Sequence, residues 1–217
     1  KRGWTGADVL TQIRKAFPDA RCALETDVNV AALGEHRWGA GVGCRNLVYV
    51  TMGTGIGAGF LVDGKLRQHG PHPEVGHMRL PRIPGDSFSG VCPFHGDCWE
   101  GLCSGPALAR RAGGPADLQP SDWSGWALAA QYTALALANL IYVAAPARVI
   151  VGGGAMRAGQ LGNIALLQLI RQHLPVAMNG FAVPNELSVY PDSFLVAPGL
   201  GENAGLLGAM TLALTKY

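Results

Sequence analysis

Metal-binding side chains are concentrated near the middle of the chain. Cys92, His95 and Cys98 follow one another at three-residue intervals. Zinc prefers four tetrahedral ligands drawn from thiolate sulfur and imidazole nitrogen, and closed sets of such ligands are structural. The fourth ligand must come from elsewhere, and we expect it to be His77, with His72 as its competitor. Scattered buried cysteines beside a surface histidine are the alternative, but the complete run with an upstream, glycine-flanked histidine favours a zinc site.

The segment that would hold this metal has little regular structure of its own. Residues 69–96 are dense in glycine, proline and histidine and show little periodicity. We therefore expect an ordered loop, which zinc binding could stabilise by roughly 10 kcal/mol or more. Cys103 follows on a predicted helix and is a weaker ligand candidate. The chain has 5 cysteines. This odd number, without a secretory signal, argues against a disulfide framework and fits a reducing cytoplasm.

Two glycine-rich turns could hold phosphate groups. The first, Gly53–Gly57, lies between two apolar runs and contains Thr54. Its glycines would let backbone N–H groups approach a phosphate, and the threonine hydroxyl adds a donor. The second, Gly152–Gly154, follows a predicted strand, and open α/β sheets bind ligands at the carboxyl ends of their strands. Each could equally be a plain connecting turn, but two of them in one α/β chain favour a nucleotide site.

Three carboxylates could act on a substrate. Asp27 lies between a strand-like step and a predicted helix. That position suits a general base that takes a proton from a sugar hydroxyl, although a helix N-cap is the ordinary alternative. Glu74 and Glu100 lie beside the predicted metal segment, where they could hydrogen-bond to sugar hydroxyls. Taken singly, either could instead be a solvated surface acid.

Alternating strands and helices must position these groups. Hydrophobic periodicity, β-branched runs and glycine or proline breaks predict the elements. Strands are predicted at 22–25, 46–52, 59–62, 148–151, 187–190 and 194–196. Helices are predicted at 8–17, 27–38, 99–112, 123–145, 159–173 and 203–214. The alternation is typical of an α/β domain.

Composition excludes several classes of protein. The 217 residues are 48% hydrophobic and 15% charged, which is ordinary for a chain with a real core. A net charge of +2 without a basic stripe argues against nucleic acid or an anionic membrane as a partner. The most apolar stretch, residues 127–151, is interrupted by Gln131, Asn139 and Arg148. We expect it to be a buried core helix leading into a strand rather than a membrane span.

Together these motifs resemble the ROK family, named for repressors, open reading frames and kinases. The matching segments occur in the family's order along nearly the whole chain. They are Glu25–Asn29, Ala31–Glu35, Gly53–Gly57, His72–His77, Cys92–Gly101, Ser104–Pro106, Gly152–Gly154 and Gly201–Ala209. The resemblance implies the α/β fold of actin-like ATPases (ribonuclease H-like), mainly its C-terminal lobe, with a zinc-stapled loop.

The resemblance also implies roles for individual residues. It implies ATP-dependent phosphorylation of a hexose, with ATP, Mg²⁺ and a structural Zn²⁺ as cofactors. Asp27 would be the catalytic base, and Glu74, His77 and Glu100 would contact the sugar. The implied zinc ligands are His77, Cys92, His95 and Cys98. The implied nucleotide-binding residues are Gly53, Thr54, Gly55, Pro106, Gly152, Gly153, Gly154, Ala155 and Met156.

The form of the metal segment bears on the substrate. Its Cys-Pro-Phe-His-Gly-Asp-Cys run is similar to the fructokinase branch of the family, which implies D-fructose as substrate and fructose 6-phosphate as product. Other ROK kinases, for glucose, mannose or an N-acetylated hexosamine, are alternatives. So are a ROK regulator that only senses sugar and a non-catalytic sugar-binding module. Family kinases often form dimers, so a homodimer is one expected assembly.

The resemblance further suggests a division of the chain. Residues 1–45 would be the remnant of an N-terminal lobe and the interdomain region that carries Asp27, and residues 46–217 would be the C-terminal nucleotide- and sugar-binding domain. Family kinases begin with an Asp-x-Gly-Gly-Thr phosphate motif, which does not occur in this sequence, and the sequence opens at Lys1 rather than at a methionine. We therefore expect a truncated form with poor kinase activity on its own.

Overall fold

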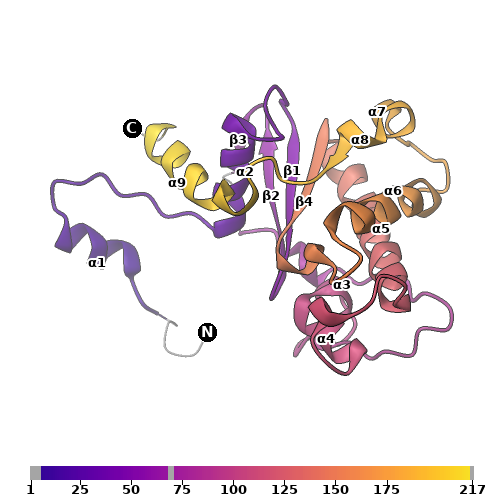
Figure 1. The fold of residues 1–217 in the computed structure, drawn as a ribbon. Coiled ribbons are helices and arrows are strands. Elements are labelled where there is room, and N and C mark those ends of the chain that lie inside the picture. The colour runs from indigo at the N-terminus through magenta and orange to yellow at the C-terminus, as the bar shows by residue number, and fades with distance from the viewer. Residues whose placement is uncertain (1–5, 68–70, 216–217) are drawn as a thin grey trace.

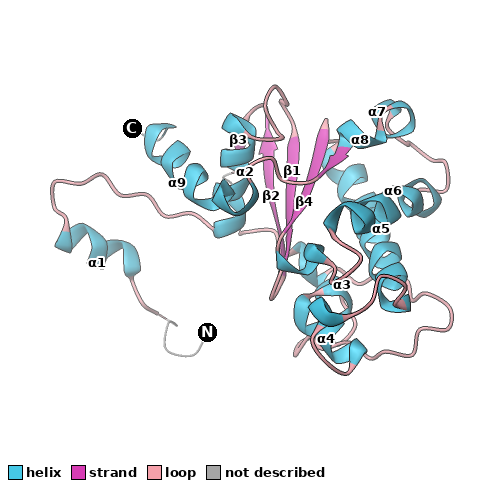
Figure 2. Ribbon diagram, viewed as in Figure 1, coloured by secondary structure: helices cyan, strands magenta, loops and turns pink. Residues whose placement is uncertain are grey.

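A computed structural model describes residues 6–67 and 71–215 of the chain, and one mixed sheet lies at its centre (Figures 1 and 2). Its strands are β1 (Leu47–Met52), β2 (Ile56–Val62), β3 (Lys65–Leu66), β4 (Arg148–Gly152) and β5 (Leu195–Val196). They lie in the order β3-β2-β1-β4-β5. β1, β2 and β3 pair antiparallel, whereas β4 runs parallel to β1 and β5 runs parallel to β4. The carboxyl ends of β1 and β4 therefore meet at one edge of the sheet.

Helices cover both faces of this sheet (Figure 1). On one face α2 (Asp27–Trp38) packs against α9 (Ala204–Thr215), and on the other α5 (Ser124–Ala144) packs against α6 (Asn163–Ala177). The remaining described helices are α1 (Val9–Ala16), α3 (Trp99–Cys103), α4 (Gly105–Ala112), α7 (Asn185–Val189) and α8 (Pro191–Phe194). α1 lies apart from the body of the molecule in Figure 1 and buries none of its residues.

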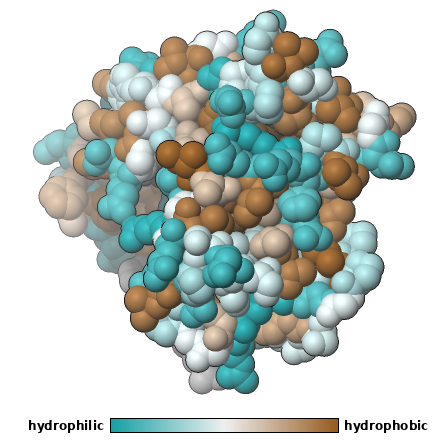
Figure 3. Space-filling view, turned by 45° about the vertical axis from the view of Figure 1, so that its right-hand side comes forward, coloured by the Kyte–Doolittle hydropathy of each residue, from teal (hydrophilic) through white to brown (hydrophobic). Residues whose placement is uncertain are grey.

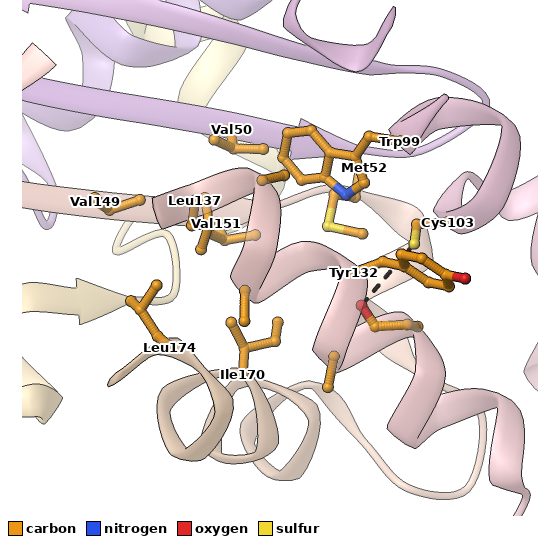
Figure 4. Packing of buried hydrophobic residues seen from close by; sticks show 14 of the residues in the cluster. Val50, Met52, Trp99, Cys103, Tyr132, Leu137, Val149, Val151, Ile170 and Leu174 are labelled. Carbon is orange, nitrogen blue, oxygen red and sulfur yellow. Dashed lines mark hydrogen bonds between the residues drawn. The ribbon is translucent and has the colours of Figure 1, made fainter. Parts of the chain in front are cut away.

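Strand β1 supplies side chains to two separate cores. Successive side chains of a strand point to opposite faces of its sheet. Val48, Val50 and Met52 pack into the larger core with α5 and α6, and Leu47 and Tyr49 pack into the smaller one with α2 and α9. Figure 4 shows the larger core, where side chains of β1, β4, α3, α5 and α6 meet. Burial on both faces explains why the first four residues of β1, Leu47–Val50, are an unbroken apolar run.

The layer formed by α2 and α9 is packed closely enough to fix α2 on the sheet. The helix predicted at 27–38 is confirmed with these bounds. A methyl group added to Gly208 would lie 1.5 Å from the backbone carbonyl oxygen of Val30, so only glycine lets α9 approach α2 this closely. Asp27, the first residue of α2, is therefore carried by a rigid element.

The longest described helix, α5, lies largely inside the protein. α5 has 21 residues and is long and apolar enough, by length and composition alone, to span a membrane. Its Ala134, Ala136 and Leu137 are fully buried in the larger core, and β4 follows four residues after its end. The prediction of a core helix leading into a strand is thus confirmed. The face in Figure 3 mixes hydrophilic and hydrophobic residues.

Several predicted elements differ from the observed ones. Residues 22–25 do not form a strand, because they have no pairing partner among the described residues. The strand predicted at 187–190 is wrong: residues 187–189 belong to the short helix α7, which begins directly after Pro184 and ends before Tyr190. A proline just before the first turn is compatible with a helix start, which the apolar pattern alone did not reveal.

Two predicted helices have different bounds. The helix predicted at 99–112 is divided at Ser104, whose hydroxyl oxygen accepts the N–H of Ala107 at 3.4 Å and caps α4. The helix predicted at 159–173 begins only at Asn163, because Gly159 and Gly162 have φ angles of 51° and 83°. Such left-handed conformations are incompatible with a continuing α-helix.

Candidate functional site

Two cysteines and two histidines converge at the loop that precedes α3. Ligand atoms of His77, Cys92, His95 and Cys98 all lie within 4.8 Å of one another. His77 Nδ1 is 3.6 Å from both sulfur atoms, and His95 Nδ1 is 3.7 Å from Cys92 Sγ. Tetrahedral zinc with usual bond lengths places its nitrogen and sulfur ligands about 3.5 Å apart. The geometry therefore fits the four-ligand set expected from the sequence.

The two competing ligands lie elsewhere. Cys103 is fully buried in α3, where its thiol contacts the Ala129 carbonyl oxygen at 3.9 Å, and burial raises its pKa to about 12. His72 lines a cavity described below and is not in the metal group. Burial likewise raises the pKa of the Cys98 thiol to about 11, and a bound Zn²⁺ would favour its thiolate form.

Short backbone contacts bring the two halves of the metal group together. The N–H of Trp99 donates to the carbonyl oxygen of Met78 at 3.0 Å, and Arg79 forms an antiparallel bridge with Cys98. A second bridge joins Cys92 to Gly96. These contacts close the loop from residue 78 to 91 and bring His77 to the cysteines, as expected from the sequence.

A buried ion pair fastens the same loop to α4 and α5. The Asp86 side chain is 3% exposed and accepts two hydrogen bonds from Arg111, at 2.6 and 3.0 Å, and one from the Tyr132 hydroxyl at 2.8 Å. Burial alone would raise the pKa of Asp86, but the hydrogen bonds from Arg111, Tyr132 and the Phe88 N–H outweigh it and lower the pKa to about 2. Sequence reasoning missed this pair, because its members are 25 residues apart and follow no motif.

Carboxylates line a cavity of about 460 Å³ beside the sheet edge. Asp27, Glu74 and Glu100 all contribute to its wall, together with Thr54 and His72. The structure thus brings together three of the four residues predicted to bind or activate a sugar. The fourth, His77, does not line this cavity, because its ring faces the cysteines of the metal group.

Asp27 lies where its carboxylate can act on a ligand. The N-cap of α2 is Thr26, whose hydroxyl oxygen accepts the N–H of Asn29 at 3.4 Å, so the alternative reading of Asp27 as the cap is wrong. Asp27 Oδ1 accepts the N–H of Val28 at 2.8 Å, and the residue is exposed toward the cavity. The helix N-terminus places partial positive charge beside this carboxylate.

Glu100 connects the metal loop to the first glycine turn. Its Oε2 accepts the N–H of Ile56 at 2.9 Å, at the start of β2. A methyl group on Gly55 would lie 2.7 Å from the same oxygen, so the glycine makes room for the carboxylate. Because Cys98 lies two residues before Glu100, a bound metal would also hold this side chain in place.

The first glycine turn also lines a second cavity, of about 520 Å³. Gly53 and Thr54 contribute to both cavities, whereas Gly55 lines only the first. On the far side, Pro106, Gly154 and Ala155 line the second cavity. Five of the nine predicted nucleotide-binding residues therefore surround it, and the two cavities meet at the Gly53–Thr54 backbone.

The second glycine turn packs directly on the end of β1. Gly153 has a φ of 99°, and a methyl group there would lie 2.4 Å from the Met52 carbonyl oxygen. Gly152, Gly153 and Met156 line a smaller cavity of about 220 Å³ on the other side of this turn. The structure therefore separates these three predicted nucleotide contacts from the 520 Å³ cavity.

Glu35 is a buried carboxylate that sequence reasoning did not single out. Its side chain is fully buried, and its two oxygens accept N–H groups from Ala40 at 2.7 Å, Gly199 at 2.9 Å and Leu200 at 2.9 Å. It ties the end of α2 to the loop after β5. The signal available in the sequence was an acid directly after the apolar run Val30–Gly34 of α2, at a place where a buried charge must be compensated.

The mixed sheet has helices on both faces and cavities where β1 and β4 end. This arrangement defines the fold class. It is the actin-like ATPase fold of sugar kinases. The solved ROK hexokinase from Thermus thermophilus superposes with a TM-score of 0.76 at 28% identity, over 95% of this chain and 69% of that protein. A ROK family glucokinase from Streptomyces griseus, in complex with glucose and AMPPNP, gives 0.68 at 27% identity, over 94% and 72%.

The sequence comparisons place the chain within that class. It belongs to the ROK family, whose model matches residues 1–216. A putative fructokinase from Bacillus subtilis is 41% identical over 213 residues, which is 98% of this chain and 69% of that protein. The chain thus aligns almost completely with a relative that is longer than itself.

Proposed function

We propose that this protein transfers the γ-phosphoryl group of ATP to a hexose, with D-fructose as substrate and fructose 6-phosphate as product. The observation that carries the proposal is the meeting of two cavities at Gly53 and Thr54, with Asp27 on the wall of one and Pro106 and Gly154 on the wall of the other. A phosphoryl group at this junction would lie between a nucleotide and a sugar. Family membership and the fructokinase relative support the same reaction.

The chemistry assigned to the first cavity is proton removal. In this proposal Asp27 takes the proton of the attacking sugar hydroxyl, a step that a positioned carboxylate can perform as general base. Glu74 and Glu100 accept hydrogen bonds from other hydroxyls and orient the sugar. We propose that His77 serves as a ligand of the metal group. A direct contact between His77 and the sugar stays a prediction.

The second cavity is proposed to hold ATP. Backbone N–H groups of the turn at Gly53 and the Thr54 hydroxyl would face the phosphates, and Gly154 and Ala155 would flank the nucleoside. Mg²⁺ accompanies ATP in this proposal, because phosphoryl transfer depends on neutralising the charge of the γ-phosphate. Gly152, Gly153 and Met156 line the 220 Å³ cavity, and we propose that they support the second glycine turn.

The metal group is proposed to hold a structural Zn²⁺. When bound, zinc would supply no chemistry of its own here, because a closed Cys₂His₂ set leaves no open position. Its part would be to keep the loop from His77 to Cys98 folded against β2, so that Glu74 and Glu100 keep their positions. The 3.6 Å spacing of His77 Nδ1 and the two sulfur atoms supports this assignment.

The test is a panel of sugars assayed for ADP release with MgATP. We expect fructose to give the highest kcat/KM, and glucose, mannose and N-acetylmannosamine to give lower values. The low turnover expected of this chain alone stays a prediction that the same assay measures. A chain that binds a sugar in calorimetry but releases no ADP would favour the sugar-sensing alternative. No turnover and no binding with any hexose would refute the proposal.

The division at residue 45 and a homodimeric state also remain proposals. α2, on the N-terminal side of this division, packs against α9 and the sheet, so a boundary at residue 45 would fall between elements that share a core. Limited proteolysis, which cuts exposed linkers first, would locate the boundary. Sedimentation equilibrium would give the assembly state.

A further inference from the structure

One residue of the carboxylate-lined cavity has no part in the function proposed above. His72 lines this cavity together with Asp27, Glu74 and Glu100. The metal group has four ligands without it. Its ring is partly buried, and within the described chain no protein group forms a hydrogen bond with it. The imidazole is therefore available to a ligand.

The backbone holds His72 in a defined direction. It lies between Pro71 and Pro73, and a residue that precedes proline is restricted to extended conformations. In an extended segment, residues two apart point to the same side. His72 and Glu74 accordingly both line the cavity, whereas Pro73 between them does not.

The segment after His72 is anchored, so the direction is kept. Val75 and Gly76 are buried, and a methyl group on Gly76 would lie 2.2 Å from the Ile56 carbonyl oxygen of β2. The next residue, His77, belongs to the metal group. His72 is thus five residues from a metal ligand and four from a close contact with the sheet.

Besides the hydroxyl groups of Thr26, Thr51 and Thr54, the cavity wall has one side-chain hydrogen-bond donor, the imidazole of His72. Ionised carboxylates only accept hydrogen bonds, so Asp27, Glu74 and Glu100 suit the O–H groups of a sugar. The ring oxygen of a sugar carries no hydrogen and can only accept. Among the described residues that line this cavity, His72 is the single side chain with a nitrogen atom, and an imidazole carries an N–H donor in either protonation state.

We propose that His72 is a sugar-binding residue, which donates a hydrogen bond from its imidazole to an acceptor oxygen of the hexose. The inference rests on the proposed hexose-kinase function and adds a contact to it. It assigns His72 to the substrate and not to the metal. It also predicts that loss of the ring weakens sugar binding and leaves ATP binding and zinc content alone.

The experiment is calorimetric titration of fructose into the chain and into three variants. His72→Ala should bind fructose about tenfold more weakly, the usual effect of losing one hydrogen bond in a ligand site. His72→Gln keeps an N–H donor and should recover part of this loss. His173→Ala is the matched control, because His173 lies on α6 and lines none of the three cavities, and it should bind like the unaltered protein.

Zinc content and the dissociation constant for MgATP are measured on the same samples. Unchanged fructose binding in His72→Ala would overturn the inference, and so would a loss of zinc or of MgATP affinity, which would show a structural or metal role. Failure of the unaltered chain to bind any hexose would instead overturn the proposed function, and the inference with it. The two failures are therefore distinguishable by the behaviour of the unaltered protein.

Discussion

The buried pair between Asp86 and Arg111 gives the sharpest prediction about stability. Asp86→Asn removes the charge that compensates Arg111, whose side chain is only 10% exposed. Breaking a buried pair by removing one partner typically costs about 3–5 kcal/mol, because the other charge stays buried and unpaired. Asparagine keeps one acceptor for Arg111 or Tyr132, so we expect the lower end, about 3 kcal/mol. Urea unfolding in the presence of zinc would measure the change in the free energy of unfolding.

The same pair predicts a dependence on pH. The pKa of Asp86 is about 2 in the folded protein, against 3.8 for the unperturbed carboxyl. A carboxylate whose pKa is lowered by folding stabilises the protein above its unfolded pKa and loses this contribution as the pH falls through the folded value. From pH 5 to pH 2 the unaltered chain should therefore lose about 2 kcal/mol relative to Asp86→Asn. All other groups are the same in both proteins, so their contributions cancel in the comparison.

An exposed pair provides the control for both measurements. Arg45 and Asp63 lie 2.6 Å apart, but their side chains are 82% and 66% exposed. Asp63→Asn should change the unfolding free energy by less than about 1 kcal/mol, because exposed pairs are screened by solvent. Equal effects of the two substitutions, or parallel pH profiles for the unaltered chain and Asp86→Asn, would refute the reasoning.

Two further predictions concern the metal and the buried carboxylate of α2. Cys98→Ser should lower the zinc content, measured by elemental analysis, from one atom per chain to a small fraction. It should also make the loop before α3 sensitive to protease. Full zinc occupancy with unchanged proteolysis would contradict the assigned ligand set. Glu35→Gln turns an amide NH₂ toward at least one of the three buried N–H groups that Glu35 accepts. The free energy of unfolding, measured by urea titration, should therefore fall by roughly 1–3 kcal/mol. An unchanged midpoint would contradict the hydrogen bonds assigned to Glu35.

The elements that carry the site could be predicted because their local signals were strong. The apolar run that became β1 ends in a glycine turn, and the helix from Asp27 to Trp38 ends before Gly39, so pattern and punctuation agreed. The metal group was predictable because ligand spacing is short in sequence. His77 was the one distant member of the metal group. The sequence allows a loop after His77 that brings it to the cysteines, but it does not require that loop, so His72 stayed a competitor.

The errors arose where tertiary contacts decide. Residues 187–190 have strand-like composition, but residues 187–189 lie in α7. This short helix begins after Pro184 and buries the side chain of Leu187. Contact of Gly152 and Met156 with a nucleotide stays a prediction; the cavity that they line depends on how the second glycine turn packs against Met52, which no local pattern encodes. The partners of Asp86 and Glu35 are likewise far away in sequence, up to 165 residues for Leu200. Pairings of this kind follow from the fold and not from spacing.

The most direct test of the central claim is the effect of Asp27→Asn on phosphoryl transfer to fructose. If Asp27 is the base, kcat should fall by about 10²- to 10⁴-fold relative to the unaltered chain, while the calorimetric dissociation constant for fructose changes by less than about threefold. Asparagine preserves the shape of the side chain and can still accept the Val28 N–H, so the fold should be retained. Equal turnover by the two proteins would contradict the account.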